Sequence, residues 1–138
     1  MPLTVGPESM DRLGHVNNVE YVRWLEAVSW AHIESLGMTW ALQEETGRAM
    51  AILRTEIDYL GAAVAGERLL LGTWLVAFDG RLRSERRFQL VREANGRTLM
   101  RALSRHACID MATQRPARVP EAFRRILEEA VIPGEGQA

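Results

Sequence analysis

One helix constrains the fold of this chain more than any other segment. The residues from Val19 to Leu36 fit a single helix, which a good N-cap residue, Asn18, precedes and a glycine, Gly37, follows. At 100° steps its charged side chains share one narrow strip, formed by Glu20, Arg23 and Glu34. Nearly all other positions are apolar, so most of the helix surface needs to be covered. We therefore expect a central helix that other elements pack around.

After this helix the apolar period changes from 3.6 to 2, which indicates strands. Arg48 to Leu60 alternates and predicts a half-buried strand, whereas Arg68 to Phe78 is apolar on both faces and predicts a central strand. On the first strand, the side chains expected to face the core are Ala51, Leu53, Thr55, Ile57 and Tyr59. Two turn pairs, Asp79-Gly80 and Asn95-Gly96, are typical of hairpins. They predict two further strands, at about Leu82–Arg92 and Thr98–Met111.

The order of elements predicts an α+β fold. It comprises a short N-terminal strand, the long helix, a four-stranded antiparallel meander and a last helix at about Glu121–Ala130. One antiparallel five-stranded sheet then wraps around the long central helix. Residues 1–132 are expected to form this single domain, and the Gly-rich residues 133–138 a flexible tail. The sheet keeps an edge to protect, so we expect oligomerisation.

Charge and residue usage exclude several classes of function. The 18 acidic and 17 basic residues nearly cancel, which disfavours a nucleic-acid-binding protein. No apolar run approaches the ~20 residues of a membrane span, and the N-terminus does not fit a signal peptide, so we expect a cytoplasmic protein without membrane association. The single cysteine, Cys108, cannot form an internal disulfide and, with three histidines, does not suit a cysteine-based zinc site. The absence of lysine excludes Schiff-base chemistry.

The segment just before the long helix carries the strongest chemical signal. Asp11 lies in a Gly-containing loop that leads directly into the helix. The first turn of a helix has free N–H groups that stabilise developing negative charge. A carboxylate that faces such a site suits attack on an acyl carbonyl. The spacing alone leaves a second interpretation open, in which Asp11 and Asn18 only cap and hold the loop.

The motif Asp-x-x-Gly-His-Val-Asn-Asn-x-x-Tyr, from Asp11 to Tyr21, closely resembles that of the hot-dog-fold acyl-CoA thioesterases of the 4-hydroxybenzoyl-CoA thioesterase type. Ile57–Leu60 and Gly66-Glu67 are similar to the second-strand and turn signature of this family, and Arg115–Pro120 to its closing segment. The resemblance covers nearly the whole chain. It implies a hot-dog fold and hydrolysis of an acyl-CoA substrate, with no cofactor and no metal. It also implies sites formed between the subunits of a homodimer or homotetramer.

The resemblance implies roles for individual residues as well. The catalytic carboxylate of the family falls on Asp11, acting as general base or as nucleophile. The backbone N–H that polarises the thioester carbonyl falls on Asn18. Gly14 matches a glycine that lets the backbone approach the substrate, and Tyr21 matches an aromatic residue one turn into the helix. The expected substrate-binding residues are Gly14, His15, Asn17 and Tyr21.

Several alternatives stay open. Many relatives carry a second acidic residue two positions before the catalytic Asp; Ser9 stands there in this chain, which disfavours a two-carboxylate mechanism. Glu26 on the long helix is the fallback catalytic residue. An acyl-thioester hydratase or dehydratase is a second hypothesis, although the spacing of Asp11 and His15 differs from that of hot-dog hydratases. A non-catalytic acyl-thioester-binding protein is a third.

The remaining candidates lie outside the motif. A group of arginines either binds the phosphates of coenzyme A or forms a solvated strand face: Arg81, Arg83, Arg86 and Arg87. His32 and His106 are expected to be structural, and Cys108 to be an inert core thiol. His15 is either a base or a structural histidine that bonds the backbone of its loop.

Overall fold

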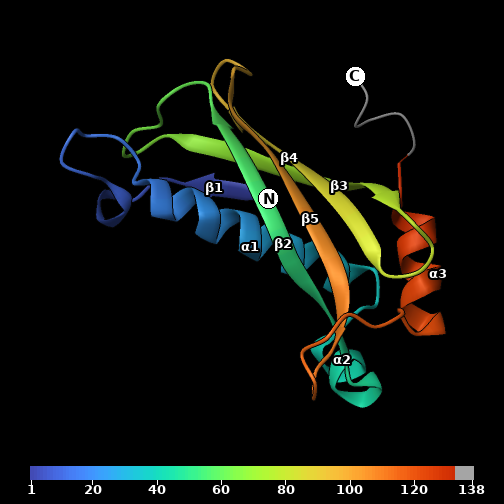
Figure 1. Ribbon diagram of the computed structural model, residues 1–138. Helices are drawn as coiled ribbons and strands as arrows, with labels where there is room; N and C mark the ends of the chain where they lie inside the picture. The colour runs from blue at the N-terminus through green and yellow to red at the C-terminus, as the bar shows by residue number, and fades with distance from the viewer. Residues whose placement is uncertain (133–138) are drawn as a thin grey trace. The chain divides into compact units, whose positions relative to one another are not determined.

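The computed structural model describes residues 1–132. The predicted tail at 133–138 lies outside the described residues, and the single domain over 1–132 stays a prediction. The elements (Figure 1) are β1 (Pro2–Thr4), a 3₁₀ turn (Pro7–Ser9), α1 (Asn18–Ser35), α2 (Trp40–Thr46), β2 (Arg48–Tyr59), β3 (Arg68–Phe78), β4 (Arg83–Arg92), β5 (Thr98–Asp110) and α3 (Glu121–Ala130). The predictions for β3 and α3 are confirmed to the residue, and those for β2, β4 and β5 differ by one residue at one end.

The five strands form one sheet in the order β1-β3-β4-β5-β2 (Figure 1). The predicted meander is correct for β3, β4 and β5 but wrong for β2, which pairs with β5 rather than with β3. The N–H groups of Leu60 and Gly61 donate to the carbonyl of Leu99 on β5, at 2.9 and 3.1 Å, and hold the end of β2 there. β1 takes the place beside β3, antiparallel, with Leu3 opposite Leu69. Five antiparallel strands with three helices confirm the α+β class.

The described chain forms two compact units. The first comprises Met1–Trp30, Ile57–Thr73 and Phe88–Ala102, and the second Ala31–Glu56, Trp74–Arg87 and residues 103 to 132. In the first unit, buried side chains of α1 pack against apolar residues of β3, β4 and β5. The core contains Tyr21, Leu25 and Val28 of α1, Leu69 and Leu71 of β3, Phe88 and Leu90 of β4, and Leu99 of β5. Burial of such side chains stabilises the fold by roughly 1.5–3 kcal/mol each. This packing fixes the start of α1 beside the sheet.

The second unit has an apolar core of its own. Phe123 and Leu127 lie one helical turn apart on α3, so they share a face and both are buried. They pack with Leu75 of β3 and with Met38, which follows α1. The predicted last helix is therefore an amphipathic element that completes this core.

α1 ends at Ser35, one residue before the predicted Leu36, and the predicted glycine, Gly37, follows it. Gly37 adopts a φ of +101°, the left-handed region that favours glycine. The N–H of Gly37 donates to the carbonyl of Glu34 at 3.0 Å, and the N–H of Met38 donates to the carbonyl of Ile33 at 2.9 Å. These two bonds form a Schellman C-cap, and Ile33 also packs on the core that contains Met38.

Several large apolar side chains remain exposed in the single chain. β2 was predicted to be half-buried, yet Leu53 is 55% and Tyr59 48% exposed, and Ile52 on the opposite face is 60% exposed. α1 was expected to be covered on most sides, yet Val19 and Val22 are more than half exposed. Both expectations are wrong for one isolated chain. The side chains of β2 are more exposed than predicted because β2 lies at an edge of the sheet and has a neighbouring strand on one side only.

Candidate active site

The segment from Met10 to Asn17 closes into a loop, the 10–17 loop. Met10 and Val16 form an antiparallel bridge. The N–H of Asp11 donates to the carbonyl of His15 at 2.7 Å, and the N–H of Asn17 donates to the carbonyl of Ser9 at 2.8 Å. These bonds place the start of α1 beside the residues that precede Asp11. The loop therefore brings the predicted carboxylate and the predicted helix N-terminus together.

The carboxylate of Asp11 is anchored by its own loop. Its Oδ1 accepts the N–H of Leu13 at 2.8 Å and the N–H of His15 at 3.1 Å. Gly14, between these two donors, has a φ of +77°, which a glycine adopts without strain. Within residues 1–132, no hydrogen bond is found on Oδ2. One carboxylate oxygen thus holds the loop, while the other is available for chemistry.

The N-terminus of α1 corrects one detail of the sequence analysis. Asn17, and not Asn18, is the capping residue, because its Oδ1 accepts the N–H of Val19 at 3.0 Å. Asn18 is the first residue of the helix. No acceptor for the Asn18 N–H is found in the described part of the chain. This N–H is therefore one of the open donors of a helix N-terminus, where the helix dipole favours negative charge.

Tyr21, in the first turns of α1, belongs to an aromatic cluster. Its ring centroid is 5.2 Å from that of Tyr59 and 5.5 Å from that of Trp24, both edge-on. Burial raises the pKa of the Tyr21 hydroxyl, and the negative charges of Glu67 and Asp11 raise it further. A hydrogen bond with the backbone of Ala63 lowers this pKa, but by less than burial raises it. Tyr21 is thus a neutral, nearly buried residue within electrostatic reach of Asp11, and its phenol faces Ala63.

The other candidates differ in their exposure. Gly14, His15 and Asn17 are exposed on the 10–17 loop, where a ligand can reach them. Glu26 is exposed on α1.

Among residues 1–132, no group of three or more His, Cys, Asp or Glu side chains could hold a metal ion. The described chain also contains no helix that is long and apolar enough to span a membrane.

The predicted arginine group does not act as one surface. Arg81 and Arg83 are exposed, but Arg86 is only 3% exposed and lies on the face of β4 that carries the buried Phe88. Strand alternation explains the difference, because every second side chain of β4 points to the same face. The prediction of a solvated face, and that of a phosphate site, are therefore wrong for Arg86.

Arg86 forms part of a cluster of basic side chains in the second unit. Its Nη1 lies 2.8 Å from Nδ1 of His32. Burial, together with the charge of Arg86, lowers the pKa of His106 to about 4, and both causes also lower the pKa of His32. Burial lowers the pKa of Arg86 itself to about 10, so it stays charged at neutral pH. Both histidines are therefore neutral and structural at pH 7.

This cluster predicts a loss of stability in mild acid. The unfolded chain binds a proton on His106 near pH 6.5, and the folded chain binds it only near pH 4. The free energy of unfolding should therefore fall as the pH falls through this window, by up to roughly 3 kcal/mol for His106. Urea unfolding at a series of pH values measures the slope. His106→Gln should flatten it, whereas His15→Gln, at an exposed histidine, should not; an unchanged slope in the first variant would refute the assignment.

A second segment, residues 62–67, which we call the 62–67 loop, contacts the 10–17 loop through Ala63, and no sequence pattern indicates this contact. Ala63 is fully buried, and its carbonyl accepts the N–H of Val16 at 3.0 Å. The pair Gly66-Glu67 was noted only as part of a family signature. No local pattern indicates that this loop touches the 10–17 loop, because about fifty residues separate the two in the chain.

The family model of the thioesterase-like superfamily matches residues 5–127. The chain belongs to the thioesterase-like superfamily. The chain is similar to the long-chain acyl-CoA thioesterase FadM of Escherichia coli (strain K12), 28% identical over 124 residues that cover 88% of this chain and 91% of FadM. The predicted family and the predicted class of enzyme, a thioester hydrolase, are confirmed.

Two solved structures share the fold of this chain. The protein SAV2348 of Staphylococcus aureus, in complex with CoA, has a TM-score of 0.86 at 19% identity, covering 94% of this chain and 80% of that one. The 1,4-dihydroxy-2-naphthoyl-CoA thioesterase Slr0204 of Synechocystis has a TM-score of 0.82 at 18% identity, covering 94% of both chains. At these identities the likeness concerns the fold, and it confirms the predicted hot-dog fold.

Proposed function

We propose that this chain hydrolyses acyl-CoA thioesters with Asp11 as the working carboxylate and the backbone N–H of Asn18 as the oxyanion donor. The observation that carries the proposal is the arrangement around Asp11. One oxygen is bound by two loop amides, and the loop ends at a helix N-terminus with an open donor. FadM, named a long-chain acyl-CoA thioesterase, and SAV2348, solved with CoA, support an acyl-CoA substrate.

The reaction needs only water and the thioester. Asp11 either takes a proton from the attacking water or attacks the thioester carbon itself. In both cases the carbonyl oxygen becomes negative in the transition state, and a fixed N–H donor stabilises it. The C–S bond then breaks, and CoA leaves as a thiolate that takes up a proton. If Asp11 acts as the base, the attacking water becomes part of the acid, which leaves as a carboxylate. If Asp11 is the nucleophile, a mixed anhydride forms on its side chain, and water opens this anhydride to release the carboxylate and restore Asp11. Gly14, His15, Asn17 and Tyr21 are the proposed substrate-binding residues.

A thiol-release assay over short, long and aromatic acyl-CoAs tests this proposal. We expect release of free CoA from at least one saturated or aromatic acyl-CoA, at a rate that depends on Asp11. A hydratase would change the absorbance of an enoyl-CoA without releasing thiol. A non-catalytic binding protein would bind the ligand and release none. The last two results would refute hydrolysis and distinguish the alternatives.

We also expect a homodimer or homotetramer in solution. β2 lies at an edge of the sheet, and about half or more of the surface is exposed for its apolar residues Ile52, Leu53 and Tyr59 and for Leu60, which follows the strand. Apolar side chains on an unpaired edge favour pairing with a second copy. Light scattering should give a mass of at least twice 15.6 kDa. Ile52→Glu with Leu53→Glu should shift the protein toward monomer, while a monomeric native protein would contradict the expectation.

A further inference from the structure

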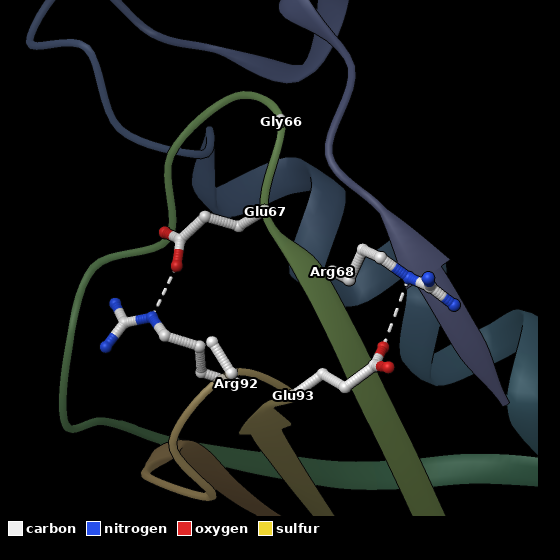
Figure 2. A pocket seen from close by; sticks show the side chains of 6 residues that line it. Gly66, Glu67, Arg68, Arg92 and Glu93 are labelled. Atoms are coloured by element: carbon white, nitrogen blue, oxygen red, sulfur yellow. Dashed lines mark hydrogen bonds and ion pairs between the residues drawn. The ribbon is translucent and has the colours of Figure 1, made fainter.

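Gly66 and Glu67 of the 62–67 loop line a pocket of about 370 Å³ together with Arg68, the first residue of β3, and with residues 92 to 94 at and after the end of β4 (Figure 2). Two ion pairs cross this pocket side by side. Arg92 binds Glu67, and Arg68 binds Glu93 at 3.2 Å. The two pairs look alike in sequence, because each joins a strand residue, Arg68 or Arg92, to a glutamate next to the other strand, Glu93 after β4 or Glu67 before β3. Their contacts with the 62–67 loop differ.

The Arg92–Glu67 pair holds the loop on both sides of Ala63. Oε1 of Glu67 accepts the N–H of Val64 at 2.8 Å, while Oε2 accepts the Nε–H of Arg92. Nη2 of Arg92 donates to the carbonyl of Ala62 at 3.0 Å. The residues before and after Ala63 are therefore both bound by one ion pair. Its side chains are only 21% and 19% exposed, so solvent screens the pair less than a surface pair.

Ala63 passes this constraint on to the candidate active site. Its carbonyl accepts the N–H of Val16, which closes the 10–17 loop around Asp11. Its backbone also hydrogen-bonds the hydroxyl of Tyr21. Two further hydrogen bonds connect the 62–67 loop to Val5, which precedes Asp11 in the chain. The N–H of Gly66 donates to the carbonyl of Val5 at 2.8 Å, and the N–H of Val5 donates to the carbonyl of Glu67 at 3.0 Å.

We propose that Glu67 and Arg92 are positioning residues for thioester hydrolysis, acting through Ala63 on the 10–17 loop. The inference rests on the proposed function of Asp11. Arg92 and Glu67 do not touch the reacting atoms, and their effect lies in the place they give to the Asp11 carboxylate. A small displacement of a catalytic group costs a large part of the rate, so loss of this pair should lower kcat more than it changes KM.

Arg92→Met is the test, because methionine keeps an apolar stem and loses both guanidinium bonds. We expect kcat to fall by roughly ten- to a hundredfold, with KM changed by less than about threefold. Arg92→Lys keeps the charge beside Glu67 and should recover part of the loss. Arg68→Met is the matched control, since Arg68 is 68% exposed and, among residues 1–132, its side chain makes no hydrogen bond to the 62–67 loop.

Amide hydrogen exchange at Val16 provides a readout that does not need turnover. Exchange should be faster in Arg92→Met than in the native protein and unchanged in Arg68→Met, measured where both variants are folded. Equal exchange and equal kcat in the two variants would overturn the inference, as would a normal kcat in Arg92→Met. A native protein that cleaves no acyl-CoA would refute the proposed function alone, and the exchange data would still decide whether the pair holds the loop.

Discussion

Asp11→Asn is expected to lower kcat for thioester hydrolysis by about 10²–10⁴-fold, the usual cost of losing a positioned general base. Asparagine has nearly the same shape, and its Oδ1 can still accept the N–H groups of Leu13 and His15. The loop should therefore survive, while the second position carries an amide that neither takes up a proton nor attacks a carbonyl. KM should change little, because the lost interaction acts in the transition state. Steady-state thiol release measures both constants.

Glu26→Gln is the control for this prediction. Glu26 is exposed on α1, and its amide should leave most of the activity intact if Asp11 is the working carboxylate. An inactive Glu26→Gln beside a nearly normal Asp11→Asn would move the catalytic assignment to the helix. Normal turnover in both variants would remove both carboxylates from the mechanism.

Asn18→Pro is expected to lower kcat by about 10²–10³-fold, the cost of removing one oxyanion donor. Asn18 is the first residue of α1, a position at which proline fits the helix. Proline there lacks the N–H and changes little else in the backbone. The variant therefore removes the backbone donor while it keeps the start of the helix, and it also removes the Asn18 side chain.

Asn18→Ala is the matched control, because it keeps the N–H and loses the side chain. It should retain near-normal kcat, and thermal unfolding of both variants should stay close to that of the native protein. An equal loss in the two variants would assign the effect to the Asn18 side chain. Full activity in Asn18→Pro would place the oxyanion donor elsewhere.

The local parts of this site follow from the sequence because they depend on neighbouring residues. Asp11, Gly14 and the start of α1 lie within eight residues of one another, and the glycine, the carboxylate and the helix signals act at that range. The same holds for the end of α1 at Gly37, where one left-handed residue stops the helix. The shift of the cap from Asn18 to Asn17 shows the limit: two adjacent asparagines have the same propensity, and only the hydrogen bond to Val19 distinguishes them.

The long-range parts do not follow from local patterns. Nothing in the alternation of β2 indicates whether it pairs with β3 or β5, because both partners offer the same backbone groups. Arg86 is buried because it lies on the face of β4 that packs on the core. Its charge alone would predict that it lies on the exposed face. The contact of Ala63 with Val16 depends on where two distant loops meet. Pairing and packing across the chain decide all three.

The two oxygens of Asp11 are not equivalent, because Oδ1 is held by the N–H groups of Leu13 and His15. If Asp11 attacks the thioester, attack occurs through Oδ2, and water that then opens the anhydride at the aspartyl carbon leaves its own oxygen in that position. In ¹⁸O-labelled water the residue should therefore take up a single label, however many turnovers follow, since the carboxylate does not rotate. A general base takes up none. One label in the peptide that contains Asp11, counted by mass spectrometry, would thus identify attack by Asp11 itself, because neither a general base nor an anhydride opened at the acyl carbon leaves a label on the residue.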